Sequence, residues 1–331
     1  MYNNHIVTWF YGEHKGNESS YPAVGANTSE LSFQVVYWRC VYDFFMSAFL
    51  TQKDTEYWLF TNVKAFPGPD LMDGVDLEAF FQKHDIHIVE QELSAQTPKD
   101  WFGEWRNQFY VYDILRYLYQ HADGRFIVFD SDIVFRKDLT DLFEQIGEYG
   151  AVAYPVNASD DEVKNGTSNN DMTKLYEAFY GEKPAMPVRY RGGEFIAVTR
   201  DMAERVVKEF EHLWPLNYAQ YEKGETKLTE EAHFLSMIYA RLGVVNTLGE
   251  RYIRRIWTAV KFDTVQAGDE ALAIWHLPAE KKYGFVKLYN WFRTGTHTKD
   301  EYLAYLGKVM MIPGSRTIRK LRRGIKRLFV K

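Results

Sequence analysis

Two aspartates that directly follow an apolar run are the residues of this sequence best suited to metal chemistry. The run Arg125–Phe129 is followed by Asp130 and Asp132, and more apolar residues come next. A short, continuously apolar run predicts a strand buried on both faces, and ligands of open α/β sheets bind where such strands end. Paired carboxylates are hard oxygen ligands that suit Mn²⁺ or Mg²⁺. We therefore predict a divalent metal site at Asp130 and Asp132; the alternative is a turn with solvated acids.

Charged residues elsewhere could serve the same chemistry. Asp113 and Arg116 are three residues apart on one face of a predicted helix, among large apolar residues. A guanidinium can bind a diphosphate in bidentate fashion, so the pair is a candidate for diphosphate binding; the alternative is an exposed ion pair. His276 ends a predicted strand and could complete the coordination of the metal. A lysine shortly after it could stabilise a leaving diphosphate.

Two further segments combine acids with small or helix-opening residues. In Arg191–Phe195, a pair of glycines precedes Glu194, and a glycine pair lets the backbone approach a ligand closely. In Glu230–Phe234, two acids and His233 open a predicted helix. Both segments also have a plain structural interpretation, because glycines suit a turn into a strand and acids favour a helix N-terminus.

The stretch Tyr112–Leu139 resembles the nucleotide-sugar glycosyltransferases of the GT-A fold. It contains Asp-Ile-Leu-Arg-Tyr followed by Phe-Asp-Ser-Asp-Ile-Val-Phe, which is similar to the Asp-x-x-Arg-Tyr and Asp-x-Asp block of those enzymes. The resemblance implies a divalent ion that bridges a nucleotide diphosphate. It also implies that Asp132 is the direct metal ligand and that Asp130, the next ligand, reaches the sugar or ribose.

Two other resemblances concern the remaining site residues. The elements Gly-Gly-Glu-Phe and Glu-Glu-Ala-His resemble Gly-Gly-x-Phe and Asp-Glu-Ser-His-Leu of the retaining family 6 transferases, with Ala232 in place of Ser. This implies that Glu231 lies below the anomeric carbon of the sugar, with Glu194 as the alternative catalytic residue. The segment around His276 is similar to the late His and Lys element of family 8 transferases, in which Lys282 has the expected spacing but Pro-Trp is missing.

Strand and helix patterns alternate along the chain, which predicts an α/β fold with a mixed, mainly parallel sheet flanked by helices. We expect one catalytic domain over residues 1–310, of the Rossmann-like GT-A type by resemblance, and a tail over 311–331. The polar stretch Asn157–Thr173 is predicted to be a long surface loop. By their positions in such a fold, Thr8 and Tyr11 are candidates for nucleotide binding. Tyr252 and Trp257 are candidates for acceptor binding, because sugar rings stack on aromatic side chains and these two lie in the charged stretch Arg251–Lys261. The predicted strands are His5–Phe10, Tyr57–Thr61, Ile86–Val89, Arg125–Phe129, Ala151–Pro155, Glu194–Thr199 and Ala271–His276. The predicted helices are Val35–Leu50, Leu77–Lys83, Trp105–His121, Leu139–Ile146, Met202–Leu213 and Glu230–Leu242.

The composition narrows the cellular setting. Hydrophobic residues make up 46% and charged residues 26% of the 331 residues, as in soluble globular proteins. The single cysteine rules out an internal disulfide, and the N-terminus has no secretory signal pattern, so we expect a cytoplasmic protein. Residues 315–331 hold eight Lys/Arg and no acid, with an apolar stripe at helical spacing. This predicts a basic amphipathic helix that attaches the protein peripherally to the inner face of an anionic membrane. The alternatives are a disordered solubilising tail and a nucleic-acid arm, although the acidic body argues against a nucleic-acid binder.

Several enzyme classes lack their signatures in this sequence. No Gly-x-Gly-x-x-Gly, no P-loop, no Gly-x-Ser-x-Gly and no His-Glu-x-x-His element is present. The resemblance implies a Mn²⁺- or Mg²⁺-dependent enzyme that moves a hexose, with retention, from a UDP-sugar to a glycan or glycolipid acceptor. The basic tail, which is similar to that of some lipooligosaccharide transferases, favours surface polysaccharide or lipooligosaccharide synthesis. The alternatives are a nucleotidyltransferase on a similar sheet and a membrane-associated protein that binds sugar nucleotides without catalysis.

Overall fold

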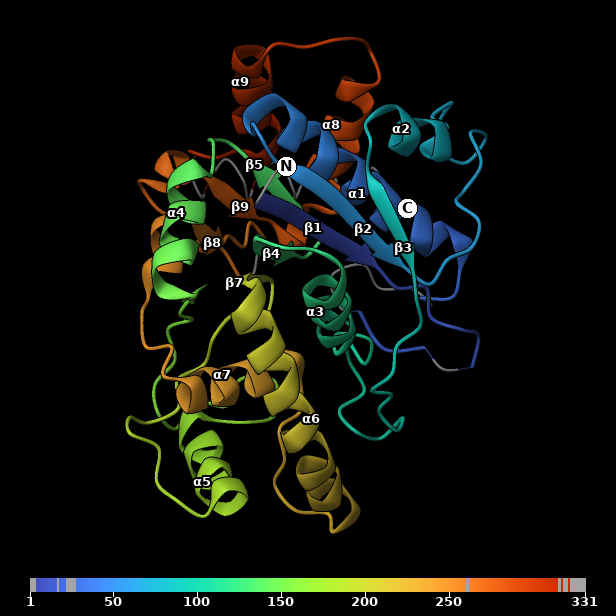
Figure 1. Ribbon diagram of the computed structural model, residues 1–331. Coiled ribbons are helices and arrows are strands. Elements are labelled where there is room, and N and C mark those ends of the chain that lie inside the picture. Colours follow the sequence, from blue (N-terminus) through green and yellow to red (C-terminus); the bar gives the residue numbers. More distant parts are fainter. Residues whose placement is uncertain are drawn as a thin grey trace.

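The computed structural model describes residues 4–16, 18–21, 28–259 and 262–314, together with Thr317 and Leu321. Its centre is a six-stranded sheet in the order β3-β2-β1-β4-β7-β6 (Figure 1). Strands β3, β2, β1 and β4 run parallel, β7 is antiparallel to β4, and β6 is antiparallel to β7. This confirms the predicted mixed, mainly parallel sheet. The six strands are β1 (Asn4–Phe10), β2 (Glu56–Thr61), β3 (His87–Glu90), β4 (Arg125–Phe129), β6 (Ala151–Val152) and β7 (Phe195–Thr199).

A smaller sheet of three strands lies beside the end of β4. Its order is β5 (Ile133–Phe135), β9 (Ile274–His276) and β8 (Ile253–Arg255). Strand β5 is antiparallel to β9, and Ile133 lies opposite His276 in this pairing. The pairing therefore places the end of β9 beside the residues that connect β4 to β5.

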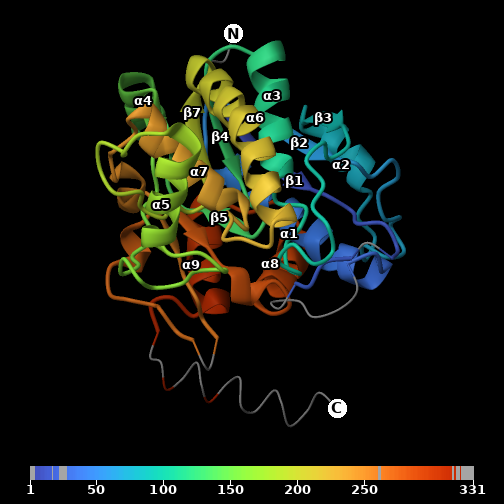
Figure 2. The same ribbon diagram turned by 90° about the horizontal axis from the view of Figure 1, so that it is seen from below.

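Helices cover both faces of the main sheet (Figures 1 and 2). The helices of one face share an apolar core, and they are α1 (Leu31–Thr51), α2 (Leu77–Lys83), α4 (Thr140–Tyr149), α8 (Gly284–Phe292) and α9 (Lys299–Met310). The helices of the other face share a second core, and they are α3 (Tyr110–His121), α5 (Asn169–Tyr180), α6 (Arg200–Glu222) and α7 (Glu231–Leu242). Three short 3₁₀ helices complete the described chain: η1 (Leu248–Arg251), η2 (Asp269–Ala271) and η3 (Pro278–Glu280).

Strand β4 explains why the sequence before the aspartates is continuously apolar. Ile127 and Phe129 belong to the core under α1, whereas Phe126 and Val128 belong to the core under α3. Alternate side chains of a strand point to opposite faces, and here both faces are covered. The prediction of a strand buried on both faces is confirmed.

Two helices that the sequence analysis did not identify begin at capping boxes. The predicted loop Asn157–Thr173 ends inside α5, because Ser168 caps this helix and Asp171 completes the box. Helix α9 was not predicted and begins in the same way, with Thr298 as its N-cap and Glu301 as the reciprocal acid. A capping box satisfies two backbone N–H groups that the first turn leaves without partners, so it stabilises the start of each helix.

The boundaries of two predicted helices also differ from the structure. Helix α3 begins at Tyr110 rather than at Trp105, a residue whose φ of 44° is incompatible with a right-handed helix. Helix α6 runs on past Leu213 and through Pro215 to Glu222. Its second half is held by the side-chain amide of Asn217, which donates to Leu228 O at 2.9 Å and accepts from Leu228 N at 2.7 Å.

The predicted tail helix lies almost entirely outside the described residues. Beyond Gly314 the structure describes only Thr317 and Leu321, so the domain boundary near residue 310 and the membrane attachment remain predictions. Within the described part of the chain, no helix combines the length and the apolar character needed to cross a membrane.

One buried acid of α1 is a source of pH-dependent stability. Asp43 is completely buried, and neither of its carboxylate oxygens has a hydrogen-bond partner. Burial raises the pKa of this carboxyl well above its usual 3.8, and the charge of nearby Arg39 offsets only part of the effect. The folded protein thus keeps a proton on Asp43 at pH values where the unfolded chain releases it. This contribution to stability is complete below pH 3.8 and is lost as the pH rises.

We expect Asp43→Asn to be about as stable as the wild type near pH 4 and more stable at pH 8. The amide has the shape of the protonated acid, but it needs no proton from the solvent. Urea unfolding of both proteins at several pH values measures the difference, which must grow with pH. A difference that is the same at pH 4 and pH 8 would show that Asp43 is ionised in the folded protein.

Candidate active site

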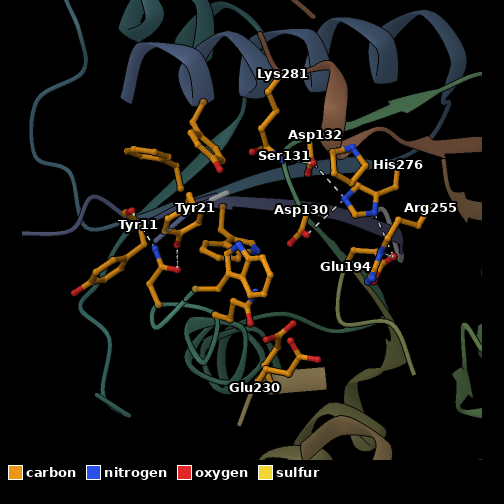
Figure 3. A pocket seen from close by; sticks show the side chains of 18 of the residues that line it. Tyr11, Tyr21, Asp130, Ser131, Asp132, Glu194, Glu230, Arg255, His276 and Lys281 are labelled. Carbon is orange, nitrogen blue, oxygen red and sulfur yellow. Dashed lines mark hydrogen bonds and ion pairs between the residues drawn. The ribbon is translucent and has the colours of Figure 1, made fainter. Parts of the chain in front are cut away.

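A cavity with about 1170 Å³ of empty space, partly open to solvent, lies at the carboxyl ends of β1 and β4. One wall is mostly aromatic and comes from the end of β1, the start of α1 and the segment that connects them. Its other walls come from the residues after β4, the start of α7 and the strands β8 and β9 (Figure 3). This is the edge of the sheet at which the sequence predicts a ligand site.

Asp130, Asp132 and His276 form a cluster in this cavity that could hold a metal ion. One ligand atom from each lies within 4.8 Å of the others. His276 Nε2 is 3.2 Å from Asp132 Oδ2 and 3.9 Å from Asp130 Oδ2. Ligands bound at about 2.1 Å on opposite sides of an ion are roughly 4 Å apart, so the cluster needs only a small contraction. Two carboxylates and one imidazole are a donor set that Mn²⁺ accepts, and the residues therefore fit the predicted metal.

The imidazole of His276 is oriented by a second carboxylate. His276 Nδ1 is 3.2 Å from Glu194 Oε1, and Arg255 Nε donates to the same oxygen at 2.7 Å. The other Glu194 oxygen forms an ion pair with a terminal nitrogen of Arg255. Burial alone would raise the pKa of Glu194, but Arg255 and His276 outweigh it and hold that pKa well below its usual range. A carboxylate on one ring nitrogen leaves the other to face the metal, which is the usual support of a histidine ligand.

The two aspartates of the cluster have opposite electrostatic environments. Burial and the neighbouring charge of Asp132 raise the pKa of Asp130 to about 6. Burial also acts on Asp132, but the ammonium of Lys281 and the ring of His276 outweigh it, and its pKa lies well below its usual range. The ion pair between Lys281 and Asp132 is itself buried. Lys281 therefore supplies positive charge directly beside the candidate metal ligands.

Two adjacent glutamates at the start of α7 form the opposite end of the cavity. Glu230 accepts hydrogen bonds from the hydroxyl of Tyr190 at 2.5 Å and from the amide of Asn165 at 2.6 Å. Burial raises its pKa to about 7, although these hydrogen bonds act in the other direction. Oε2 of Glu231 is buried and has no hydrogen-bond partner. Burial, then the charges of Glu230 and Asp130, raise the pKa of Glu231 well above its usual range.

The glycine pair before β7 makes room for these carboxylates. A side chain on Gly193 would overlap Oε1 of Glu231, and one on Gly192 would overlap Glu194 and Tyr154. From the glycine pair, the sequence analysis predicted that the backbone comes close to a ligand. In the structure, this backbone comes close to two acidic side chains of the protein itself.

The turn around Asn165 is a part of the site that the sequence analysis did not identify. It closes through backbone hydrogen bonds between Lys164 and Thr167. His233 holds it to α7, because its ring lies 3.1 Å from the carbonyl oxygen of Lys164 and 3.0 Å from the hydroxyl of Thr229. Burial lowers the pKa of His233 to about 3, so the ring is neutral. The sequence feature that could have identified this turn is the Asn-Gly pair at 165–166, which is typical of a tight turn.

The structure brings some of the remaining predicted residues to the cavity and leaves others away from it. Tyr11 and Trp257 line the cavity, as does Lys281. Lys282, the lysine selected from its spacing, is exposed and is not among the lining residues. Thr8 is buried within β1, where its hydroxyl donates to Phe129 O at 3.2 Å.

Three other candidates have partners outside the cavity. Asp113 accepts hydrogen bonds from the backbone N–H and the hydroxyl of Ser94, at 2.9 and 2.6 Å. Arg116 forms ion pairs with Asp113 and with Glu211 of α6. The hydroxyl of Tyr252 donates to Asp141 of α4. None of these side chains is among the lining residues of the cavity.

Comparison with known proteins finds similarity to solved structures. No family model matches the chain, and no curated protein matches it. Among solved structures, the chain is similar to the apo form of mouse xyloside xylosyltransferase 1, with a TM-score of 0.47 and 8% sequence identity. The match covers 82% of this chain and 97% of the mouse chain. At this level the similarity carries no argument about activity, so the functional conclusions below depend on the residues of the site.

We expect Glu194→Gln to weaken Mn²⁺ binding by roughly tenfold to a hundredfold, because the orientation of His276 depends on this carboxylate. Electron paramagnetic resonance of free Mn²⁺ measures the affinity without any substrate. Glu211→Gln is the matched control, since Glu211 also pairs with an arginine but lies outside the cavity. Equal affinities for both variants and the wild type would contradict a metal site that includes His276.

Proposed function

We propose that the protein is a metal-dependent glycosyltransferase of the GT-A type that transfers a hexosyl group from a UDP-sugar to a hydroxyl of a glycan or glycolipid acceptor. The observation that carries the proposal is one cavity with a candidate metal cluster at one end and two buried glutamates at the other. The first could hold the diphosphate of a donor, and the second would then face the sugar attached to it.

At the metal end, the proposed task is to stabilise the departing diphosphate. Asp130, Asp132 and His276 would hold Mn²⁺ or Mg²⁺, which supplies positive charge that neutralises the developing negative charge of a leaving group. Lys281 adds a buried ammonium at the same place. Such preorganised charge stabilises the transition state most effectively in a cavity that excludes water.

At the other end, Glu231 is the proposed catalytic carboxyl group. Both oxygens of Glu194 are engaged by Arg255 and His276, so we assign Glu194 a positioning role. Oε2 of Glu231 is buried and has no hydrogen-bond partner in the described protein, so a hydroxyl of the sugar could supply one. Positive charge developing at the anomeric carbon would be stabilised by this carboxylate, on the face opposite to the leaving group, in a transfer with retention. Neutralising Asp130 removes one cause of the raised pKa of Glu231, so metal binding favours its ionised form.

Donor hydrolysis tests the proposal as a whole. We expect slow, metal-dependent release of UDP from at least one UDP-sugar, and its loss in EDTA. Asp132→Ala should lower the rate by roughly a thousandfold or more, because it removes a metal ligand and also leaves Lys281 without its ion-pair partner. Asp141→Ala, which alters an acid of α4 outside the cavity, is the control. Hydrolysis by Asp132→Ala at the wild-type rate in EDTA would contradict the proposed mechanism.

Glu231→Gln separates binding from catalysis. It keeps the size of the side chain and removes its charge, which matters mainly in the transition state. We expect kcat to fall by roughly a hundredfold or more while the dissociation constant of the UDP-sugar changes by less than about threefold. Steady-state kinetics combined with calorimetric titration of the donor measures both. A large loss in Glu194→Gln at saturating Mn²⁺, with none in Glu231→Gln, would transfer the catalytic role to Glu194.

A further inference from the structure

Charge is unevenly distributed along the cavity. The cationic residues among its described lining are Arg255, His276 and Lys281. Each is already paired with a carboxylate at or beside the metal cluster: Arg255 with Glu194, His276 with both Glu194 and Asp132, and Lys281 with Asp132. Glu230 lies well away from Lys281 in Figure 3, at the other end of the cavity. Among the described residues of the lining, the glutamate end therefore has no cation of its own that could neutralise an entering anion.

The glutamate end also contains a buried oxygen that lacks a hydrogen-bond partner. Glu231 is 8% exposed and belongs to the cavity lining, and its Oε2 has no hydrogen-bond partner in the described protein. Buried polar atoms are almost always hydrogen-bonded, so an unpaired oxygen on a side chain of the cavity lining points to a ligand that donates a hydrogen bond.

A hydroxyl group can satisfy this oxygen and a carboxylate cannot. A hydroxyl donates a hydrogen bond, so it can pair with Glu231 Oε2. A carboxylate only accepts, and here it would be buried beside two carboxyl groups, with no unpaired cation among the described residues of the lining. Like charges at such a site repel, and burying an unpaired charge is costly.

Building on the proposed function, we propose that Glu230 and Glu231 make this enzyme specific for donors that transfer an uncharged sugar, and that they exclude uronic acid donors. The diphosphate would occupy the same metal end in both kinds of donor. The discrimination would arise only where the C6 group of the sugar differs, as a hydroxymethyl group in a neutral hexose and as a carboxylate in a uronic acid.

Calorimetric titration at pH 8 with saturating Mn²⁺ tests this proposal by comparing five ligands. They are UDP, UDP-glucose, UDP-galactose, UDP-glucuronic acid and UDP-galacturonic acid. Two donor pairs share a configuration, glucose with glucuronic acid and galactose with galacturonic acid. In at least one of these pairs, we expect the uronic acid donor to bind at least tenfold more weakly than the neutral donor. In Glu230→Gln, this ratio should shrink at least threefold while the affinity for UDP stays at the wild-type value. Glu177→Gln, which alters an exposed acid of α5, is the matched control and should keep the wild-type ratio.

The possible results distinguish a failure of the specificity proposal from a failure of the proposed glycosyltransferase function. Uronic acid donors that bind as tightly as their neutral counterparts overturn the specificity proposal while the glycosyltransferase proposal stands. The same conclusion follows if the wild-type preference is unchanged in both Glu230→Gln and Glu231→Gln. Absence of binding by UDP and by all four donors would instead overturn the proposed function. The affinity for UDP in each variant also reports whether its cavity is intact, so a misfolded variant cannot imitate a loss of discrimination.

Discussion

The close packing of five carboxyl groups in one cavity is the physical constraint on which the site depends. Asp130, Asp132, Glu194, Glu230 and Glu231 all line it, and unpaired carboxylates at this density would repel one another strongly. The protein handles the two ends differently. At one end, arginine, lysine and histidine side chains keep Asp132 and Glu194 ionised. At the other end, burial raises the pKa of both glutamates, and no cation of the described lining forms an ion pair with either of them.

The fold creates this contrast by bringing distant strands together. Strand β9 pairs with β5, which begins one residue after Asp132, and β8 pairs with β9 and presents Arg255 beside His276. Asp130 N is 3.4 Å from Glu194 O, which ties the end of β4 to the segment before β7. The start of α7 then supplies the glutamates, against the glycines of the same segment. The two ends consequently meet at the segment of Glu194, whose side chain pairs with His276 and Arg255 while the preceding Gly193 lies against Glu231.

The proposed division of labour follows from which side chains still have free hydrogen-bonding capacity. Glu194 has used both oxygens to hold Arg255 and His276, so it can orient but has little left for a substrate. Glu231 keeps one oxygen without a partner. His233, although it stands in a motif with catalytic resemblance, uses its ring to hold the turn at Asn165 against α7. A motif residue can thus support the site without lining the cavity, because it fixes a segment that does.

The local sequence pattern was enough to predict the alternation of strands and helices. It also predicted the buried strand that ends at the two aspartates, because the periodicity of apolar residues depends only on nearby sequence. It also placed Asp130, Asp132 and His276 at strand ends, where the cavity lies. Tertiary structure decided everything that depends on side-chain direction and long-range pairing. It placed Lys281 rather than Lys282 in the cavity, and it turned Asp113 and Arg116 toward Ser94 and Glu211. It also brought Arg255 and Asn165 into the site from segments with little signal. The physical reason is that adjacent residues face different directions, and which direction meets the ligand depends on partners more than a hundred residues away in the chain.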